Sequence, residues 1–531
     1  MNADALLAQY ERIAEAPDAI PRLRRFVLDL AVRGKLVPQD PADEPVSLLL
    51  PRLTEVRRRR GGETPPGVAA KAAPHELPPS WSWVFVGEAF EYDAGTKREP
   101  KDLDPVRWLL ELEDVEKDTG RLLARVRVSE RSSLSTKSEF QPGDILYGKL
   151  RPYLNKVLVA DEPGYSTTEI VVIRPYLPLC AAYCALAFRR PDFVAYVERL
   201  GRGTKMPRLR TPDAVAAVFP LPPLAEQHRI VAKVDELMAL CDRLEAARTA
   251  REATRDRLAA ASLARLNTPD PETFPSDARF ALDTLPALTT RPNQIKHLRQ
   301  TILNLAVRGK LVPQQAQEVV AAKYNSEPSN AALPSNWKVL NFGRFFDIQG
   351  GNQPPKSQFI YEPREGYVQL IQIRDLGEKP VPTYIPRGST NRFCQAGDIL
   401  IGRYGASVGK VFWAQDGAYN VAMAKFLWPK EALTAEFAFL LLKSEYLQGP
   451  LSQATRSAQA GFNKGDLAQI DFPLPPLGEQ HRIVAKMNEL MSLCDALEAS
   501  LAAATTARTR LLDATLAEAL APAVAAQDIA A

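Results

Sequence analysis

The sequence has few cysteines, no long apolar run and little net charge, and each absence excludes a class of protein. Its five cysteines are odd in number and lack Cys-x-x-Cys spacing, which argues against a disulfide scaffold and against a structural zinc site. No stretch reaches the roughly 18 to 20 apolar residues that span a bilayer, and the N-terminus carries acids where a signal peptide is basic. We therefore expect a cytoplasmic protein whose cysteines are buried as small hydrophobic residues.

Composition is otherwise that of an ordinary globular protein. The 531 residues are 46% hydrophobic and 24% charged, and at roughly 100 to 200 residues per domain they predict three or four folded units. The net charge of +4 comes from 67 basic and 63 acidic side chains. This balance does not identify a nucleic-acid partner, because a DNA-binding surface is a local patch and not a global sum.

Internal repetition is the strongest signal in the chain. Residues 219–246 (FPLPPLAEQHRIVAKVDELMALCDRLEA) are identical to residues 472–499 at 23 of 28 positions. The segment LAVRGKLVPQ occurs at 30–39 and again at 305–314. Because the order of parts is the same twice, the sequence predicts an internal pseudo-twofold repeat.

The sequence between these repeats differs in the two halves. A weaker match relates QPGDILYGKLRPYLNKV (141–157) to QAGDILIGRYGASVGKV (395–411). Strand-like stretches such as WLLELEDV and YVQLIQIRDL are broken by Gly and Pro, and FAFLLLKSEYL (437–447) reads as a helix. The pattern predicts two mixed α and β domains on a common frame.

The expected fold class is α+β, with two mixed α/β domains separated by a pair of long antiparallel coiled-coil helices. In chain order we expect an N-terminal helical segment (1–38), a linker (39–76), a first domain (77–218), a central long helix (219–267), a connector with the repeated short helix and a linker (268–333), a second domain (334–471) and a C-terminal long helix (472–531).

Each long helix carries apolar residues at alternating spacings of four and three, the pattern of a coiled-coil seam. The two seams are Ile230, Val234, Leu237, Cys241 and Leu244, and Ile483, Met487, Leu490, Cys494, Leu497 and Leu501. A helix of about 40 residues spans roughly 60 Å and makes a spacer. The short repeated helices should end at Gly34 and Gly309 and pack on this assembly.

Motifs that carry chemistry are few. The sequence has no G-x-x-x-x-G-K-[ST] loop, no nucleophile elbow and no clear nuclease constellation. NQPPK (352–356) only superficially resembles the Asn-Pro-Pro-aromatic motif of amino-methyltransferases. His228 and His481 lack ligand partners at metal spacing, which favours a surface or capping role. We expect no catalytic residues and no metal site in this chain.

Basic residues gather in short stretches. Residues 199–210 (RLGRGTKMPRLR) hold five basic side chains and no acid. Such stretches can contact phosphate, although glycine beside lysine or arginine is also common in plain surface turns. The pattern alone leaves both readings open.

The repeated motifs carry a resemblance to the specificity subunits of type I restriction-modification systems. The residues that carry it are PLPPLAEQHRIV (220–231) and PLPPLGEQHRIV (473–484), which lead into the long helices, and PGDIL (142–146) and AGDIL (396–400) in the domains between them. The likeness covers nearly the whole chain.

This resemblance implies a non-catalytic, sequence-specific DNA-binding subunit. Each of two target-recognition domains would read one half of a bipartite, gapped site, and two dissimilar domains imply an asymmetric one. The partners would be two DNA adenine methyltransferase subunits, which bind S-adenosylmethionine, and one ATP-dependent motor-endonuclease subunit that uses Mg²⁺. Such complexes act in phage defence, and this chain would hold no cofactor itself.

Charge and position supply candidate DNA contacts, because the family's base-reading residues form no portable motif. The candidates are Arg151, Arg202, Lys205 and Arg208 in the first domain and Arg403, Lys410 and Lys464 in the second. The alternative function is a structural adaptor that assembles partner enzymes through its coiled coil without reading DNA.

Overall fold

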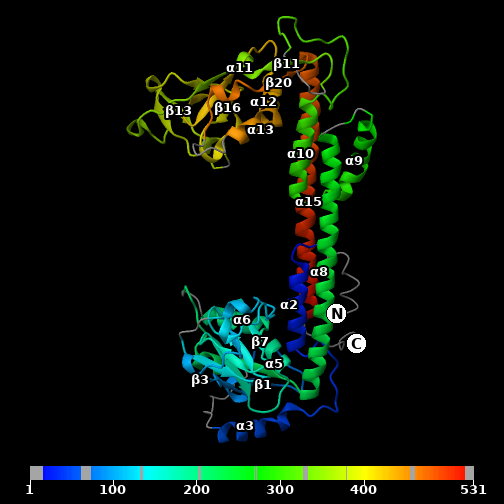
Figure 1. Ribbon diagram of the computed structural model, residues 1–531, viewed down its shortest axis with the longest axis vertical. Helices are drawn as coiled ribbons and strands as arrows, with labels where there is room; N and C mark the ends of the chain where they lie inside the picture. The colour runs from blue at the N-terminus through cyan, green and yellow to red at the C-terminus, as the bar shows by residue number, and fades with distance from the viewer. Residues whose placement is uncertain are drawn as a thin grey trace, which may run out of the picture. The chain divides into compact units, whose positions relative to one another are not determined.

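The chain forms two compact units, each built around one mixed domain. The computed structural model describes residues 16–60, 73–131, 135–200, 205–267, 270, 272–326, 333–377, 379–454 and 461–520. One unit comprises Met1–Ala250 with Thr505–Ala531, and the other comprises Arg251–Ala504. The chain passes between them inside two long helices, α8 (Leu224–Asn267) and α15 (Leu477–Leu520) (Figure 1). Across the described residues, no helix is long and apolar enough to cross a membrane.

The first mixed domain contains two four-stranded sheets, ordered β2-β9-β6-β7 and β3-β5-β8-β4, and a separate pair of β1 with β10. Its strands are β1 (Ser82–Phe85), β2 (Phe90–Tyr92), β3 (Thr96–Arg98), β4 (Trp108–Leu110), β5 (Lys137–Phe140), β6 (Ile145–Gly148), β7 (Val157–Val159), β8 (Gly164–Ser166), β9 (Ile170–Pro175) and β10 (Val218–Leu221). Its helices are α4 (Val86–Ala89), α5 (Ala181–Phe188), α6 (Pro191–Leu200) and α7 (Thr211–Val215).

The second mixed domain has nearly the same arrangement, with sheets β12-β19-β16-β17 and β14-β13-β18-β15 and the pair β11 with β20. Its strands are β11 (Lys338–Asn341), β12 (Asp347–Gly350), β13 (Tyr367–Ile371), β14 (Tyr384–Pro386), β15 (Phe393–Cys394), β16 (Ile399–Gly402), β17 (Val411–Trp413), β18 (Gly417–Tyr419), β19 (Met423–Leu427) and β20 (Asp471–Leu474). Its helices are α11 (Phe342–Phe345), α12 (Ala435–Lys443), α13 (Glu445–Ala454) and α14 (Lys464–Leu467). The expected mixed α and β content is confirmed in both domains.

The two domains share a core because a core requires pattern and volume rather than identical residues. In both, the strand that begins at the isoleucine of Gly-Asp-Ile-Leu lies in the interior of its sheet. These strands are β6 and β16, and every residue of both is buried. One edge strand differs. β3 pairs with β5 in the first domain, whereas β14 pairs with β13 in the second. The frame is therefore common to both domains, while the edges vary.

In the first unit the short repeated helix α2 (Ala19–Val32) packs against parts of both long helices. Arg248 donates to the Ala16 carbonyl at 2.8 Å and Arg24 pairs with Asp242 at 2.6 Å, so α2 runs antiparallel to α8. Arg22 pairs with Asp513, and Lys35 donates to the Leu520 carbonyl at 2.8 Å. Since α2 is thus parallel to the end of α15, α8 and α15 are antiparallel in this unit.

The second unit repeats this arrangement with α10 (Pro292–Val307). Arg299 pairs with Asp495 at 2.7 Å and Glu498 at 3.0 Å on α15. The side chain of Asn304 donates to Asn267 at 2.9 Å, at the end of α8. Each unit therefore holds a short helix, the first half of one long helix and the last part of the other. The expected stops are also present, because Gly34 and Gly309 adopt φ values of +66° and +68° after the short helices.

The seams of the long helices are buried or half-buried, but their first turns have a different partner from the one expected. Ile230 and Val234 are 0% and 1% exposed within the core of the first mixed domain, together with residues of α2. Only from Cys241 onward does the seam of α8 join a cluster with Leu512 of α15. The beginning of the seam is thus a docking face for the mixed domain rather than a two-helix coiled coil.

The duplicated Glu-Gln pair explains why this motif occurs twice. Glu226 is fully buried and accepts hydrogen bonds from Trp81 Nε1 at 2.9 Å and Gln39 Nε2 at 2.6 Å. Burial raises its pKa above the usual range, although both donors oppose this shift. In the second unit Glu479 accepts equivalent bonds from Trp337 at 2.9 Å and Gln314 at 2.7 Å. The motif therefore fixes each mixed domain to its long helix.

Gln227 completes this attachment, and its loss should destabilise the first unit. It accepts from the Cys180 backbone N–H at 2.9 Å and donates to the Pro222 carbonyl at 2.9 Å, and all three groups are buried. We expect Gln227→Ala to cost about 2 to 4 kcal/mol of unfolding free energy, because two buried backbone groups lose their partner. Urea unfolding measures this cost. The control is His228→Ala at the neighbouring exposed position, and equal effects of both changes would contradict the argument.

Three expectations about the connections were wrong. The linker over 39–76 contains a 3₁₀ turn (Val46–Leu48) and helix α3 (Leu50–Arg59), because Val46 and Leu53 are buried in the core of the first domain. The connector after α8 contains helix α9 (Phe274–Leu288). The segment assigned to the start of the central helix forms strand β10, so α8 begins at Leu224.

Candidate nucleic-acid interface

Two segments distant in sequence form a basic edge on the first mixed domain. The loop between β6 and β7 lies beside residues 205–210, because Leu150 forms a bridge with Arg208 and the Arg151 N–H donates to the Pro207 carbonyl at 2.7 Å. This contact brings together Arg151, Lys205 and Arg208, which the sequence had placed in separate stretches. We call Lys149, Arg151, Lys205 and Arg208 the first basic edge.

The second mixed domain builds the same edge from equivalent segments. Tyr404, in the loop between β16 and β17, forms a bridge with Gly461 just before α14. This bridge brings the loop that carries Arg403 and Lys410 beside the segment that carries Lys464. We call these three cations the second basic edge.

Two of the candidate cations are already paired within the chain. Arg208 pairs with Glu169 through its Nε and its second terminal nitrogen, at 3.0 and 2.8 Å. This hydrogen bonding raises the pKa of Arg208 further. Lys464 lies 2.6 Å from Asp347 and lowers the pKa of that carboxyl. Both cations remain exposed, but part of their charge is neutralised.

The other candidates present a freer charge. Arg151, Lys205 and Lys410 are exposed, and within the described ranges no carboxylate pairs with any of them. Arg403 is half-buried, with its guanidinium 5.2 Å from the ring centre of Tyr404. Arg202 lies outside the described residues. Of the seven predicted contacts, six therefore fall on the two basic edges, and whether they bind DNA stays a prediction.

Sequence reasoning missed Lys149 and Tyr404. Lys149 precedes Arg151 on the first basic edge and aligns with Arg403 in the weaker internal match. Tyr404 is 45% exposed beside Arg403 and supplies an aromatic face on the second edge. Closer use of the internal alignment would have found both.

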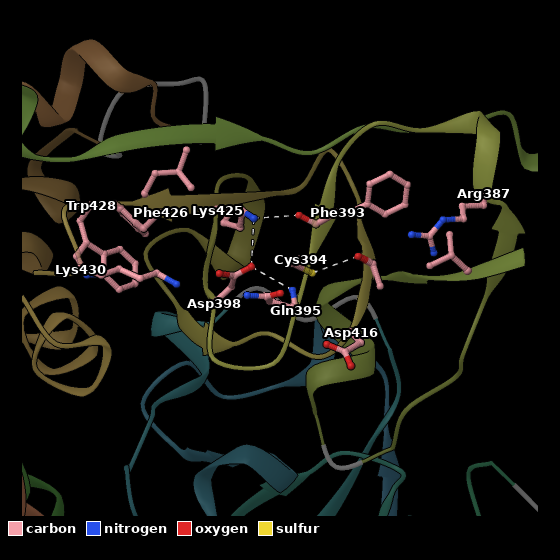
Figure 2. A pocket seen from close by; sticks show the side chains of 13 residues that line it. Arg387, Phe393, Cys394, Gln395, Asp398, Asp416, Lys425, Phe426, Trp428 and Lys430 are labelled. Atoms are coloured by element: carbon pink, nitrogen blue, oxygen red, sulfur yellow. Dashed lines mark hydrogen bonds and ion pairs between the residues drawn. The ribbon is translucent and has the colours of Figure 1, made fainter.

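A pocket of about 630 Å³ lies beside β19 in the second domain (Figure 2). Lys425 pairs with Asp398 at 3.1 Å and donates to the Phe393 carbonyl at 3.0 Å. The first domain has a similar ion pair at the equivalent aspartate, with Arg174, from a different position of the neighbouring strand, paired to Asp144 at 2.6 Å. Because the pair recurs where the domains share their core, we assign it a structural role rather than a ligand-binding one.

The sequence expectations about cysteine and histidine agree with the structure. All five cysteines are free and buried. Burial raises the pKa of Cys394 to about 12, which makes its thiol unreactive. His228 and His481 are exposed. In the part of the chain that the structure describes, no group of three His, Cys, Asp or Glu side chains could hold a metal ion.

Comparisons with known proteins find a family model and curated relatives that are similar to this chain. Residues 334–504, the second mixed domain and the first half of α15, match the type I restriction modification DNA specificity domain. The specificity subunit of the type I restriction enzyme EcoAI from Escherichia coli is 24% identical over 577 aligned positions, which cover 93% of each chain. That of EcoEI, also from Escherichia coli, is 26% identical over 570 positions with the same coverage.

A solved structure shows the same fold. A chain from a study of complex assembly and conformational transition of the type I R-M system has a TM-score of 0.53 and 23% identity. The match covers 84% of the present chain and 99% of the solved one. The resemblance read from the repeated motifs is therefore confirmed by sequence and by fold.

Proposed function

From the type I DNA specificity domain at residues 334–504 and the full-length likeness to specificity subunits, we infer that this chain is the DNA-recognition subunit of a type I restriction-modification complex. A specificity subunit recognises DNA and is not itself an enzyme. The finer proposal is that each mixed domain reads one half of an asymmetric, gapped DNA site.

The observation that carries this proposal is the basic edge, built twice from equivalent segments but with different side chains. In each domain the loop after an interior strand, β6 or β16, lies against the segment that precedes the last strand, β10 or β20. Cations on such an edge bind phosphate, and side chains among them reach base edges. Because the two edges carry different side chains at most aligned positions, as with Arg151 and Gly405, we expect the two half-sites to differ.

The duplicated frame supports a second role, the binding of two equal partners. His228 and His481 repeat on the surface of the long helices, as do the exposed Leu224 and Leu477. Residues that repeat exactly while exposed are not explained by packing within the chain. We propose that they help to dock two DNA adenine methyltransferase subunits, which carry S-adenosylmethionine. One motor-endonuclease subunit would bring ATP and Mg²⁺, so that the cofactors reside on the partners.

Methylation mapping tests the proposal. The chain is co-expressed with its methyltransferase partner, and methylated adenines are located in the host DNA by single-molecule sequencing. Residues 82–221 are then replaced by the corresponding domain of another specificity subunit. The replaced segment keeps β1 together with β10, because these strands pair from Ser82 with Leu221 to Phe85 with Val218.

We expect a gapped, two-part motif of which only one half changes after the exchange. Methylation without sequence preference, or a motif that neither domain exchange alters, would favour the structural adaptor instead. The adaptor shares the helical frame but leaves two mixed domains with different edges unexplained.

The ion pairs on the edges predict which cations matter most. We expect Lys410→Gln to weaken DNA binding for all sequences and to lower the salt slope by about one, since one phosphate contact is lost. Lys464→Gln should have a smaller effect, because its ammonium already pairs with Asp347. Binding titrations of the assembled complex at several salt concentrations measure both. A larger effect of Lys464→Gln would contradict this ranking.

A further inference from the structure

The loops between β6 and β7 and between β16 and β17 share several backbone bonds but not the same residues. In the first domain the Gly148 N–H donates to the Lys156 carbonyl at 2.9 Å, and in the second Gly402 donates to Lys410 at 2.9 Å. The bridge of Leu150 with Arg208 likewise corresponds to that of Tyr404 with Gly461. The two loops can therefore be compared position by position.

This comparison places Arg151 where the second domain has Gly405. Both residues adopt left-handed backbone conformations, with φ values of +49° for Arg151 and +64° for Gly405. Glycine adopts this conformation without strain, whereas a residue with a Cβ rarely does. The loop therefore prefers glycine at this position, and the arginine is held against the preference of its own backbone.

Nothing in the described part of the chain explains this arginine. Its backbone N–H donates to the Pro207 carbonyl, a bond that glycine would keep. Its side chain is exposed, and over the described stretches neither an ion pair nor a side-chain hydrogen bond holds it. A strained backbone conformation at a charged, exposed residue is a feature of binding sites. Because arginine, unlike aspartate, gains nothing from its own backbone in this conformation, this combination points to a ligand outside the chain.

We propose that Arg151 reads a base edge in the half-site of the first domain, and that by its donor pattern this base is guanine. The proposal rests on the proposed DNA-recognition function. Backbone bonds fix the loop on both sides of Arg151, since Leu150 is bridged to Arg208 and the Leu154 N–H donates to the Arg151 carbonyl at 2.8 Å.

A phosphate contact requires positive charge but not this fixed placement, and Lys205 can supply that charge on the same edge. Base reading requires an oriented donor fork, and the arginine fork matches O6 and N7 of guanine. A fixed backbone and a planar guanidinium therefore favour a base over a phosphate.

Two substitutions at Arg151 distinguish a base contact from a phosphate contact. Arg151→Gly relieves the backbone and removes the side chain, so we expect no loss of Tm but a large loss of methylation at the native site. Arg151→Lys keeps the charge but not the fork, so we expect one position of one half-site to lose its requirement for guanine. The same complex with the methyltransferase partner is used throughout, with methylation mapping as the readout.

Asp118→Gly is the matched control. Asp118 is exposed and also left-handed, with φ +64°, and it is not one of the residues of the first basic edge. Its backbone N–H donates to the Leu154 carbonyl, in the loop that carries Arg151, at 3.1 Å, a bond that glycine keeps. Its replacement should not lower Tm and should leave the motif unchanged.

Two outcomes overturn the proposal. If Arg151→Lys reads the native motif and Arg151→Gly weakens all sites equally, Arg151 contacts phosphate. If neither change alters methylation, the side chain has no role. Both outcomes leave the two-part motif of the native complex intact, whereas failure of the proposed function would remove that motif from the native complex itself.

Discussion

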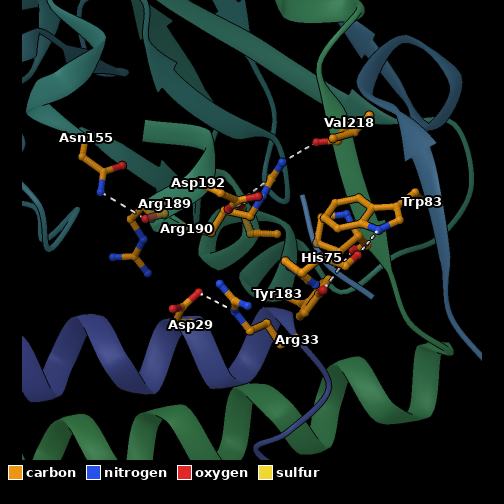
Figure 3. Close-up of polar contacts among 12 residues, drawn as sticks. Asp29, Arg33, His75, Trp83, Asn155, Tyr183, Arg189, Arg190, Asp192 and Val218 are labelled. Carbon is orange, nitrogen blue, oxygen red and sulfur yellow. Dashed lines mark hydrogen bonds and ion pairs between the residues drawn. The ribbon is translucent and has the colours of Figure 1, made fainter. Parts of the chain in front are cut away.

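Replacing Arg190 with methionine is expected to destabilise the first mixed domain by about 3 to 5 kcal/mol, since the change breaks a buried charge network. Arg190 is 1% exposed and joins three elements of the domain. It pairs with Asp192 at 2.9 Å, donates to the Ala187 carbonyl of α5 at 2.8 Å and donates to the Val218 carbonyl of β10 (Figure 3). Methionine keeps most of the volume but leaves the Val218 carbonyl and the Asp192 carboxylate without the guanidinium donor, while the Ala187 carbonyl keeps only backbone donors.

Burial lowers the pKa of Arg190 from its usual value, although Asp192 opposes the shift. The partners of Arg190 therefore hold the cation in place despite the free-energy cost of removing it from water. Loss of the guanidinium is destabilising because these buried partners lose their donor. Calorimetry should show the transition of the first unit lowered by about 6 to 20 °C, given roughly 2 to 4 °C per kcal/mol at this size. Exposed Arg199 on α6 provides the control, because Arg199→Met should change stability by less than about 0.5 kcal/mol. A shift in the unfolding temperature of Arg190→Met as small as that of Arg199→Met would contradict this prediction.

The second domain has a different side chain at the position equivalent to Arg190. Ser444 occupies the corresponding site after α12, is fully buried and donates to the Leu441 carbonyl at 2.6 Å. A single short side chain thus replaces a guanidinium network. At this position the two cores satisfy a buried carbonyl with different donors, so the shared fold does not require a shared residue here.

The frame of this protein was predictable because the chain contains its own comparison. Positions that repeat, such as Glu226 and Glu479, proved to attach a domain to a helix in both units. Helix α9 was not predictable in the same way, because its proline- and aspartate-rich start reads as a connection and its stability depends on packing against Leu263 and Leu266. Tertiary contacts outweigh local propensity in such segments.

The basic edges were only partly predictable. Charge along the chain identified Arg151 and Lys205 separately, but nothing local indicated that a loop and a distant segment would meet through the bridge of Leu150 with Arg208. Nor could the sequence reveal that Glu169 neutralises part of the charge of Arg208. Those features depend on strand pairing between residues far apart, which local patterns do not encode.

The helices that join the two units should set the gap between the half-sites. Under the proposed function each unit would read one half-site, and we expect the lengths of α8 and α15 to set the length of the unread spacer. We expect that inserting four helix-forming residues after Ala250 and four more after Ala504 widens the preferred gap by about two base pairs, because each helical residue adds roughly 1.5 Å. The half-sites should stay the same, since each unit keeps its own core. Methylation mapping measures both properties.

The rotation that an insertion adds to the helices distinguishes insertions of different lengths. Four residues turn a helix by about 40° beyond a full turn, in the same sense as the roughly 70° by which two base pairs turn the groove. Seven residues turn it back by about 20°, while the three base pairs they span turn the groove by roughly 100°.

Seven-residue insertions in both helices should therefore abolish methylation where four-residue insertions retain it. Each insertion follows a small residue, with Ala250 exposed and Ala504 half-buried, and falls at the boundary between the two units, so we expect the cores to persist. A gap that stays constant while the half-sites change would show that the helices do not measure the spacer.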